Sequence, residues 1–178
     1  MSSNKGQNPF FDAAERNFRE ASENGLPIFL TDARHSTPLN ATPYLAHYDV
    51  FREAARSWPG RLELVVMLDT VKVEVEQIGF SVEAILIGGS FTTLRTPMPN
   101  DIDCLLFYRL DPDGDPSALA HIQQSARARR VDCRFVPLDG DPLAMLKLTS
   151  YFTILYSKRK DHNEIVRSLL LLDCREKL

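Results

Sequence analysis

The chain has 178 residues, of which 44% are hydrophobic, and its formal net charge at pH 7 is −3, with a pI of about 5.8. This length and this apolar content predict one domain with its own core. The acidic balance argues against a DNA or RNA partner, and no run approaches the roughly 18 apolar residues of a membrane-spanning helix.

The cysteines and the first residues predict the cellular compartment. The three cysteines, at positions 104, 133 and 174, are odd in number and are spaced neither as a disulfide framework nor as zinc ligands. The polar residues 1–7 lack the apolar stretch of a secretory signal. We therefore expect a cytoplasmic protein with reduced thiols and no membrane partner.

The first 60 residues predict a helical extension. Apolar residues recur at helical spacing over residues 10–24, and residues 26–31 predict a short strand. Residues 32–42 are polar and contain prolines, which is typical of a loop. Thr42 followed by Pro43 is a helix N-cap with proline in the first turn, and it predicts a helix over residues 43–58.

Residues 61–140 predict the core of an α/β (α+β) fold, a small mixed sheet flanked by helices. In chain order, the apolar patterns predict a helix at 64–78, strands at 82–87 and 102–108, a helix at 116–126 and a strand at 131–136. Valines that alternate with charged residues at 71–75 also fit a strand, but the length of the segment favours the helix. Residues 141–178 predict a helix at 142–155 and a strand at 165–172, and the whole chain, 1–178, is expected to be one domain.

The most informative motif joins a glycine-serine turn to two carboxylates. Gly88, Gly89 and Ser90 end one predicted strand, and Asp101 and Asp103 follow after ten intervening residues. Residues two apart in a strand share a face, so the carboxylates are expected side by side. Two like charges about 4 Å apart repel by roughly 4 kcal/mol at an effective dielectric of 20, which a bound Mg²⁺ would offset. The alternative is a pair of solvated turn acids after Pro99-Asn100.

Asp132 is the candidate for a third carboxylate, which would complete a two-metal site. It lies in the predicted apolar strand 131–136, where an unpaired charge is costly. The alternative is an ion pair with Arg134, which shares its face. If this strand adjoins the strand at 102–108, Cys104 and Cys133 lie on the same buried side.

The glycines and the serine are typical of a phosphate cradle. Gly88 and Gly89 allow the backbone to come close to a ligand, and Ser90 offers a hydroxyl and an amide to a phosphate oxygen. A helix beginning within residues 91–94 would add its positive end. The motif is not a P-loop, because no Gly-Lys-Ser/Thr follows, and it lacks the third glycine of the dinucleotide fingerprint.

Taken together, these residues resemble the minimal nucleotidyltransferases of the DNA polymerase β superfamily, whose signature is Gly-Ser, about ten residues, then Asp-x-Asp. Gly-Gly-Ser-Phe and Pro-Asn-Asp-Ile-Asp are most similar to an uncharacterised bacterial branch. The resemblance implies that Asp101 and Asp103 bind Mg²⁺ (or Mn²⁺) and the triphosphate of an NTP such as ATP. It also implies that Asp132 assists the nucleophile and that Ser90 holds a terminal phosphate.

The expected function is transfer of an NMP from an NTP to a hydroxyl acceptor, with release of pyrophosphate. Many relatives add a helical domain that closes over the base, whereas about forty residues follow Val136 here. This short segment and the aromatic last helix leave open a binding module or antitoxin-like partner, with a protein partner on that helix. A polymerase acting on nucleic acid ends is the third alternative, and the acidic charge argues against it.

Overall fold

A computed structural model describes residues 8–95, 98–111, 114–158 and 164–175. Within these ranges the chain forms five α-helices and five strands, which confirms the predicted α/β class. The helices are α1 (Pro9–Glu23), α2 (Tyr48–Ala55), α3 (Leu62–Gln77), α4 (Ala118–Ala128) and α5 (Pro142–Ser157). The strands are β1 (Tyr44–His47), β2 (Phe80–Gly88), β3 (Ile102–Leu110), β4 (Val131–Pro137) and β5 (Leu170–Asp173). The first seven and last three residues of the chain lie outside the described ranges.

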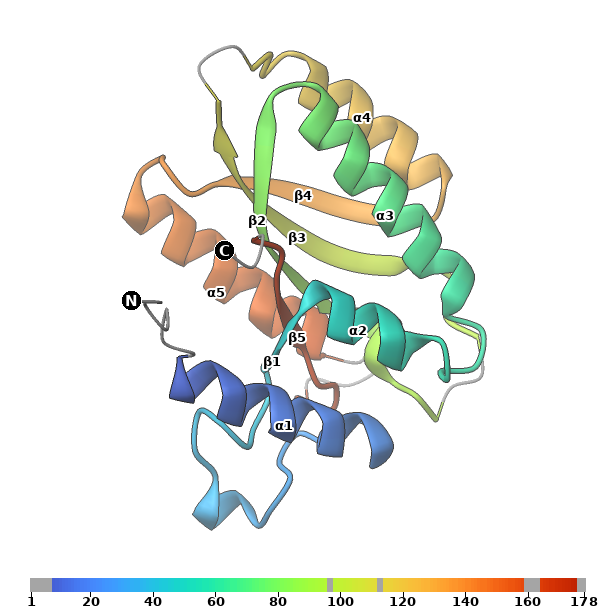
Figure 1. Ribbon diagram of the computed structural model, residues 1–178, viewed down its shortest axis with the longest axis vertical. Helices are drawn as coiled ribbons and strands as arrows, with labels where there is room; N and C mark the ends of the chain where they lie inside the picture. The colour runs from blue at the N-terminus through green and yellow to red at the C-terminus, as the bar shows by residue number, and fades with distance from the viewer. Residues whose placement is uncertain (1–7, 96–97, 112–113, 159–163, 176–178) are drawn as a thin grey trace, which may run out of the picture.

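The strands form one mixed sheet in the order β1-β5-β2-β3-β4 (Figure 1). Strand β2 is antiparallel to both of its neighbours, β3 and β5, whereas β4 is parallel to β3 and β1 is parallel to β5. Helix α4 makes the crossover that the parallel β3–β4 pair requires. The predicted core, residues 61–140, therefore supplies β2, β3 and β4 with α3 and α4, and the flanking segments add β1 and β5.

The sheet is covered on both faces (Figure 1). The larger core lies between one face and α3 and α4 and includes Leu68, Ile85 and Cys104. The smaller core lies between the other face and α5 and includes Leu105 and Tyr156. Consecutive residues of β3 thus enter opposite cores, as the two-residue period of a strand requires. Within the described ranges, no helix has the length and apolar character needed to cross a membrane.

The predicted helix at 43–58 is wrong over its first turn. Tyr44–His47 forms β1, and the helix begins only at Tyr48. The Thr42 hydroxyl donates to the Leu169 carbonyl and accepts from the Leu169 amide, and the Tyr44 amide donates to the same carbonyl. These bonds to a residue 127 positions away replace the helix cap that the local sequence favoured, so part of the predicted helical extension belongs to the sheet.

The predicted strand at 26–31 is also wrong. Leu26 has a positive φ of 56°, and its amide donates to the Ala21 carbonyl at the end of α1. The segment then pairs locally with the next loop, through a single bridge between Phe29 and Ala41. Its backbone bonds are therefore satisfied outside the sheet.

The other predicted elements are confirmed to within a few residues, with a shorter final strand. That strand spans Leu170–Asp173, because the amides of Val166 and Arg167 donate to the Ser157 carbonyl at the end of α5. Cys104 and Cys133 are register partners on β3 and β4, and both are fully buried, as predicted. Burial raises the pKa of the Cys133 thiol to about 11, so this thiol stays protonated at neutral pH.

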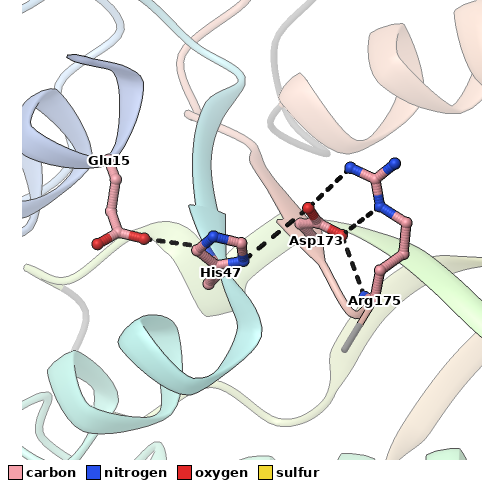
Figure 2. A network of polar contacts seen from close by, with 4 residues as sticks. All are labelled: Glu15, His47, Asp173 and Arg175. Carbon is pink, nitrogen blue, oxygen red and sulfur yellow. Dashed lines mark hydrogen bonds and ion pairs between the residues drawn. The ribbon is translucent and has the colours of Figure 1, made fainter. Parts of the chain in front are cut away.

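A polar network joins the ends of the parallel strands β1 and β5 to α1 (Figure 2). Asp173 accepts two bonds from the Arg175 guanidinium, at 2.8 and 2.9 Å, and one from the Arg175 amide at 3.1 Å. His47 Nδ1 lies 3.9 Å from Asp173 Oδ2, and the His47 amide donates to Glu15. Burial alone would raise the pKa of Asp173, but the bonds from Arg175 outweigh it and hold that pKa below the ordinary 3.8.

The network predicts how stability depends on pH. Because folding lowers the pKa of Asp173, this carboxylate stabilises the fold above pH 3.8 and loses that contribution as the pH falls through its folded pKa. We expect the stability difference between wild type and Asp173→Asn, measured by urea unfolding, to be largest near neutral pH and to shrink below pH 3.8. Arg175→Gln should reduce the pH dependence in the same way. A difference that stays constant as the pH falls would contradict this assignment.

Candidate functional site

The glycine-serine motif forms a tight turn at the end of β2. Gly88 is the last residue of the strand, and Gly89–Thr92 is a single 3₁₀ turn. The helix expected to begin within residues 91–94 is not formed, so its positive end is not available to a phosphate. The turn lies between β2 and the segment that leads to β3, the strand that carries Asp103.

A buried arginine explains why the turn does not continue as a helix. Arg61 is fully buried, and its guanidinium donates to the carbonyls of Phe91 at 2.6 Å and Thr93 at 2.7 Å. The Thr92 hydroxyl donates to the Ser168 carbonyl at 2.6 Å. Backbone carbonyls that a longer helix would use as acceptors are thus bound by side chains. The local sequence 88–95 carries no sign of these distant partners.

Gly88 and Gly89 are required for different reasons. A Cβ at Gly88 would overlap the Leu169 side chain and lie 2.6 Å from Tyr156 Cβ, so this glycine admits α5 against the sheet. Gly89 has a positive φ of 68°, and a Cβ there would overlap the carboxylate of Asp103. Gly88 therefore has a packing role, whereas Gly89 contacts Asp103, the predicted site carboxylate on β3.

The register of three strands brings Gly88, Asp103 and Asp132 into one row. Gly88 on β2 pairs with Asp103 on β3, which pairs with Asp132 on β4. Register partners on neighbouring strands lie on the same face, about 4.8 Å apart. Both carboxylates are partly exposed, and Ser90 is partly buried next to Gly89. The structure therefore gathers the turn, Asp103 and Asp132 at one end of the sheet.

Asp101 is placed differently. It lies one residue before β3 and is partly buried, and the turn that precedes it is held by Arg130, which donates to the carbonyls of Pro99 and Asn100. Among the residues that the structure describes, no group of three or more His, Cys, Asp or Glu side chains is arranged to hold a metal ion. The metal site of Asp101, Asp103 and Asp132 stays a prediction, and the strand register joins only the last two.

Arg134 lies next to the two strand carboxylates. Its guanidinium is 3.5 Å from Asp132 Oδ1, so the ion pair considered as the alternative role of Asp132 is present. Two charged carboxylates one strand spacing apart would repel by roughly 3 kcal/mol at an effective dielectric of 20. The guanidinium offsets part of this repulsion. It is itself about two fifths exposed, so it can move toward another anion.

Tyr156 completes the surroundings from α5. Its hydroxyl donates to the Cys104 carbonyl at 3.4 Å, next to Asp103 in the chain. Burial raises the pKa of this phenol far above neutral pH, and nearby negative charges, among them those of Asp103 and Asp132, raise it further. The phenol therefore remains a neutral donor. Tyr156 is buried in the core, and nothing in the sequence indicated its proximity to the acids.

Residues 30–167 match the family described as "Family of unknown function (DUF6932)", and this match covers more than half of the chain. The chain therefore belongs to this family. No match was found among curated proteins or among solved structures.

The contact between Gly89 and Asp103 yields a matched pair of variants. Gly25 also has a positive φ, 81°, but a Cβ there would meet nothing within 4 Å. Gly25→Ala should cost only the strain of left-handed backbone, about 1 kcal/mol. Gly89→Ala should cost about 1 to 3 kcal/mol more, because Asp103 must also be displaced. Chemical unfolding of both variants measures the difference, and equal losses would show that Asp103 moves away freely.

Proposed function

We propose that this member of the DUF6932 family is a Mg²⁺-dependent nucleotidyltransferase, which moves an NMP from an NTP to a hydroxyl acceptor and releases pyrophosphate. The observation that carries the proposal is the strand register that gathers Gly89 and Ser90 with Asp103 and Asp132. It is supported further by the spacing of the motif, which resembles that of the DNA polymerase β superfamily, and by the antiparallel β2–β3 pair that carries both halves.

The donor chemistry of the site suits the proposed ions. Carboxylate oxygens are the ligands that Mg²⁺ and Mn²⁺ prefer, and Asp101, Asp103 and Asp132 supply them. A bound divalent ion would neutralise the carboxylates and the triphosphate and stabilise charge on the reacting oxygens. Gly89 carries no side chain, and the space that a Cβ would need is filled by the Asp103 carboxylate, so a phosphate bound by the Ser90 hydroxyl and amide would lie beside that carboxylate.

The proposed reaction is an in-line displacement at the α-phosphorus. The acceptor oxygen forms a bond to this phosphorus while the bond to the pyrophosphate oxygen breaks, and the electron pair leaves with pyrophosphate. Asp132 orients the acceptor hydroxyl and takes up its proton. Asp101 and Asp103 hold the ions and the triphosphate, and Gly89 and Ser90 bind its terminal phosphate.

A second candidate function is supported by α5. This helix exposes large apolar side chains, including Leu143 and Ile154, which favours a nucleotidyltransferase-fold module that acts by association, like an antitoxin-like partner. Such a module would form a heteromeric complex and ignore NTP with Mg²⁺. Native mass and nucleotide binding distinguish the two functions.

The transferase proposal is tested with NTPs labelled on the α-phosphate. Purified protein is incubated with each labelled NTP, Mg²⁺ or Mn²⁺, and a cell lysate, and the labelled product identifies both the nucleotide and the acceptor. We expect Asp103→Asn to lower transfer at least about a hundredfold, because the amide loses the charge that binds the ion. Since the amide keeps the shape of the side chain, the melting temperature should not fall.

The matched control is Asp111→Asn. Asp111 is an exposed carboxylate at the opposite end of β3, and the hydrogen bond that it accepts from the Ser81 hydroxyl can be kept by the amide oxygen. Transfer by this variant should equal that of wild type. Transfer that persists in Asp103→Asn would refute the assigned role of Asp103, and a wild-type protein that labels nothing with any NTP would refute the transferase proposal.

A further inference from the structure

Helix α5 is apolar on every side, but only one side contacts the sheet. Met145, Phe152 and Tyr156 point into the smaller core. The opposite side of α5 is exposed and carries a set of apolar residues that we call the α5 patch. The α5 patch consists of Leu143, Leu146, Leu148, Tyr151, Ile154 and Leu155. A helix that is hydrophobic all round is normally buried on all sides, so the patch lacks a cover within the described chain.

The α5 patch is large enough for a specific interface. Its exposed fractions range from 41% at Leu148 to 74% at Leu143. Ile165 and Val166 extend it, because the Val166 amide donates to the Ser157 carbonyl and so places them at the end of α5. All of these side chains are at least 41% exposed, and contiguous apolar patches larger than a few hundred Å² are typical of interaction sites.

The centre of the patch is a nearly uncharged stripe. Leu143, Lys147, Ser150 and Ile154 follow one another at steps of four, three and four, and therefore form one line along the outer side of α5. Lys147 is the one charged residue between Pro142 and Ser157. A strongly charged partner would leave its charges unpaired on this stripe, so the cover must itself be apolar.

We propose that the α5 patch binds the α5 patch of a second copy of this chain, with the two helices antiparallel. A two-fold axis near Leu148 and Thr149 places Leu143 against Ile154 of the second copy and Lys147 against Ser150 of the second copy. One surface thus supplies both halves of the interface, as two-fold symmetry requires. The ammonium of Lys147 meets a hydroxyl acceptor, whereas a parallel pair would place it against another ammonium.

The pairing goes beyond the proposed transferase activity and does not depend on it, and it competes with the second candidate function, in which a different protein covers the same face of α5. It does affect the site, because α5 also carries Tyr156, whose packing against Gly88 and bond to the Cys104 carbonyl border the acids. A second copy that covers the outer side of α5 would hold this helix against the sheet.

The proposal is tested by sedimentation of the full chain over a wide range of concentrations. We expect a mass twice the 20.2 kDa of one chain. Leu143→Glu alone and Ile154→Lys alone should each weaken the dimer about a hundredfold, because each places a charge against an apolar side chain. The double variant Leu143→Glu/Ile154→Lys should dimerise again, since its opposite charges face each other across the two-fold axis.

The controls change apolar residues of similar exposure on α3. Leu62 and Val73 expose 50% and 48%, close to the 50% of Ile154, and Leu62→Glu and Val73→Lys should leave the dimer mass unchanged. A monomer at every concentration would overturn the proposal, as would a dimer that the single variants do not weaken. Failure of the double variant to dimerise again would overturn the antiparallel register. If a different protein occupies the patch in the purified material, the proposal that a second copy covers it is overturned.

Discussion

The antiparallel register between β2 and β3 is the constraint on which the candidate site depends. It pairs Gly88 with Asp103, so the carboxylate of Asp103 lies against the next residue, Gly89. That contact and the positive φ both require glycine at position 89. Arg61 holds the turn through a hydrogen bond to the Phe91 carbonyl, and β4 places Asp132 on the same face of the sheet as Asp103. Geometry set by strand pairing thus places the backbone of the glycine turn beside two carboxylates.

The charges of the site lie at the border of an apolar layer. The smaller core under α5 ends where Tyr156 approaches the row of Gly88, Asp103 and Asp132, so the acids have the apolar core on one side and solvent on the other. Such surroundings strengthen the interaction of carboxylates with a cation. Arg134 offsets part of the charge on Asp132. A divalent ion and a triphosphate would bring larger charges of both signs to the same place.

The sequence predicted an element correctly where the local pattern and the tertiary contacts favour the same structure. It predicted the wrong structure where a bond to a distant residue determined the backbone conformation. The apolar periods of α3, β2, β3 and β4 predicted these elements, and the even spacing along β3 and β4 predicted that Cys104 and Cys133 share a buried side. The bonds between Thr42 and Leu169 overrode a local helix cap, and Arg61 ended a turn that was expected to become a helix. The proximity of Tyr156 to the acids likewise depends on α5, which is remote in sequence.

The central claim is that Asp103 and Asp132 together bind a divalent ion beside a nucleotide. Electron paramagnetic resonance of Mn²⁺, titrated with protein and a non-hydrolysable NTP, measures this binding without any turnover. We expect one saturable Mn²⁺–nucleotide complex whose affinity falls at least about tenfold in Asp103→Asn and in Asp132→Asn. Equal Mn²⁺ affinity in wild type and both variants, or no complex in wild type, would contradict it.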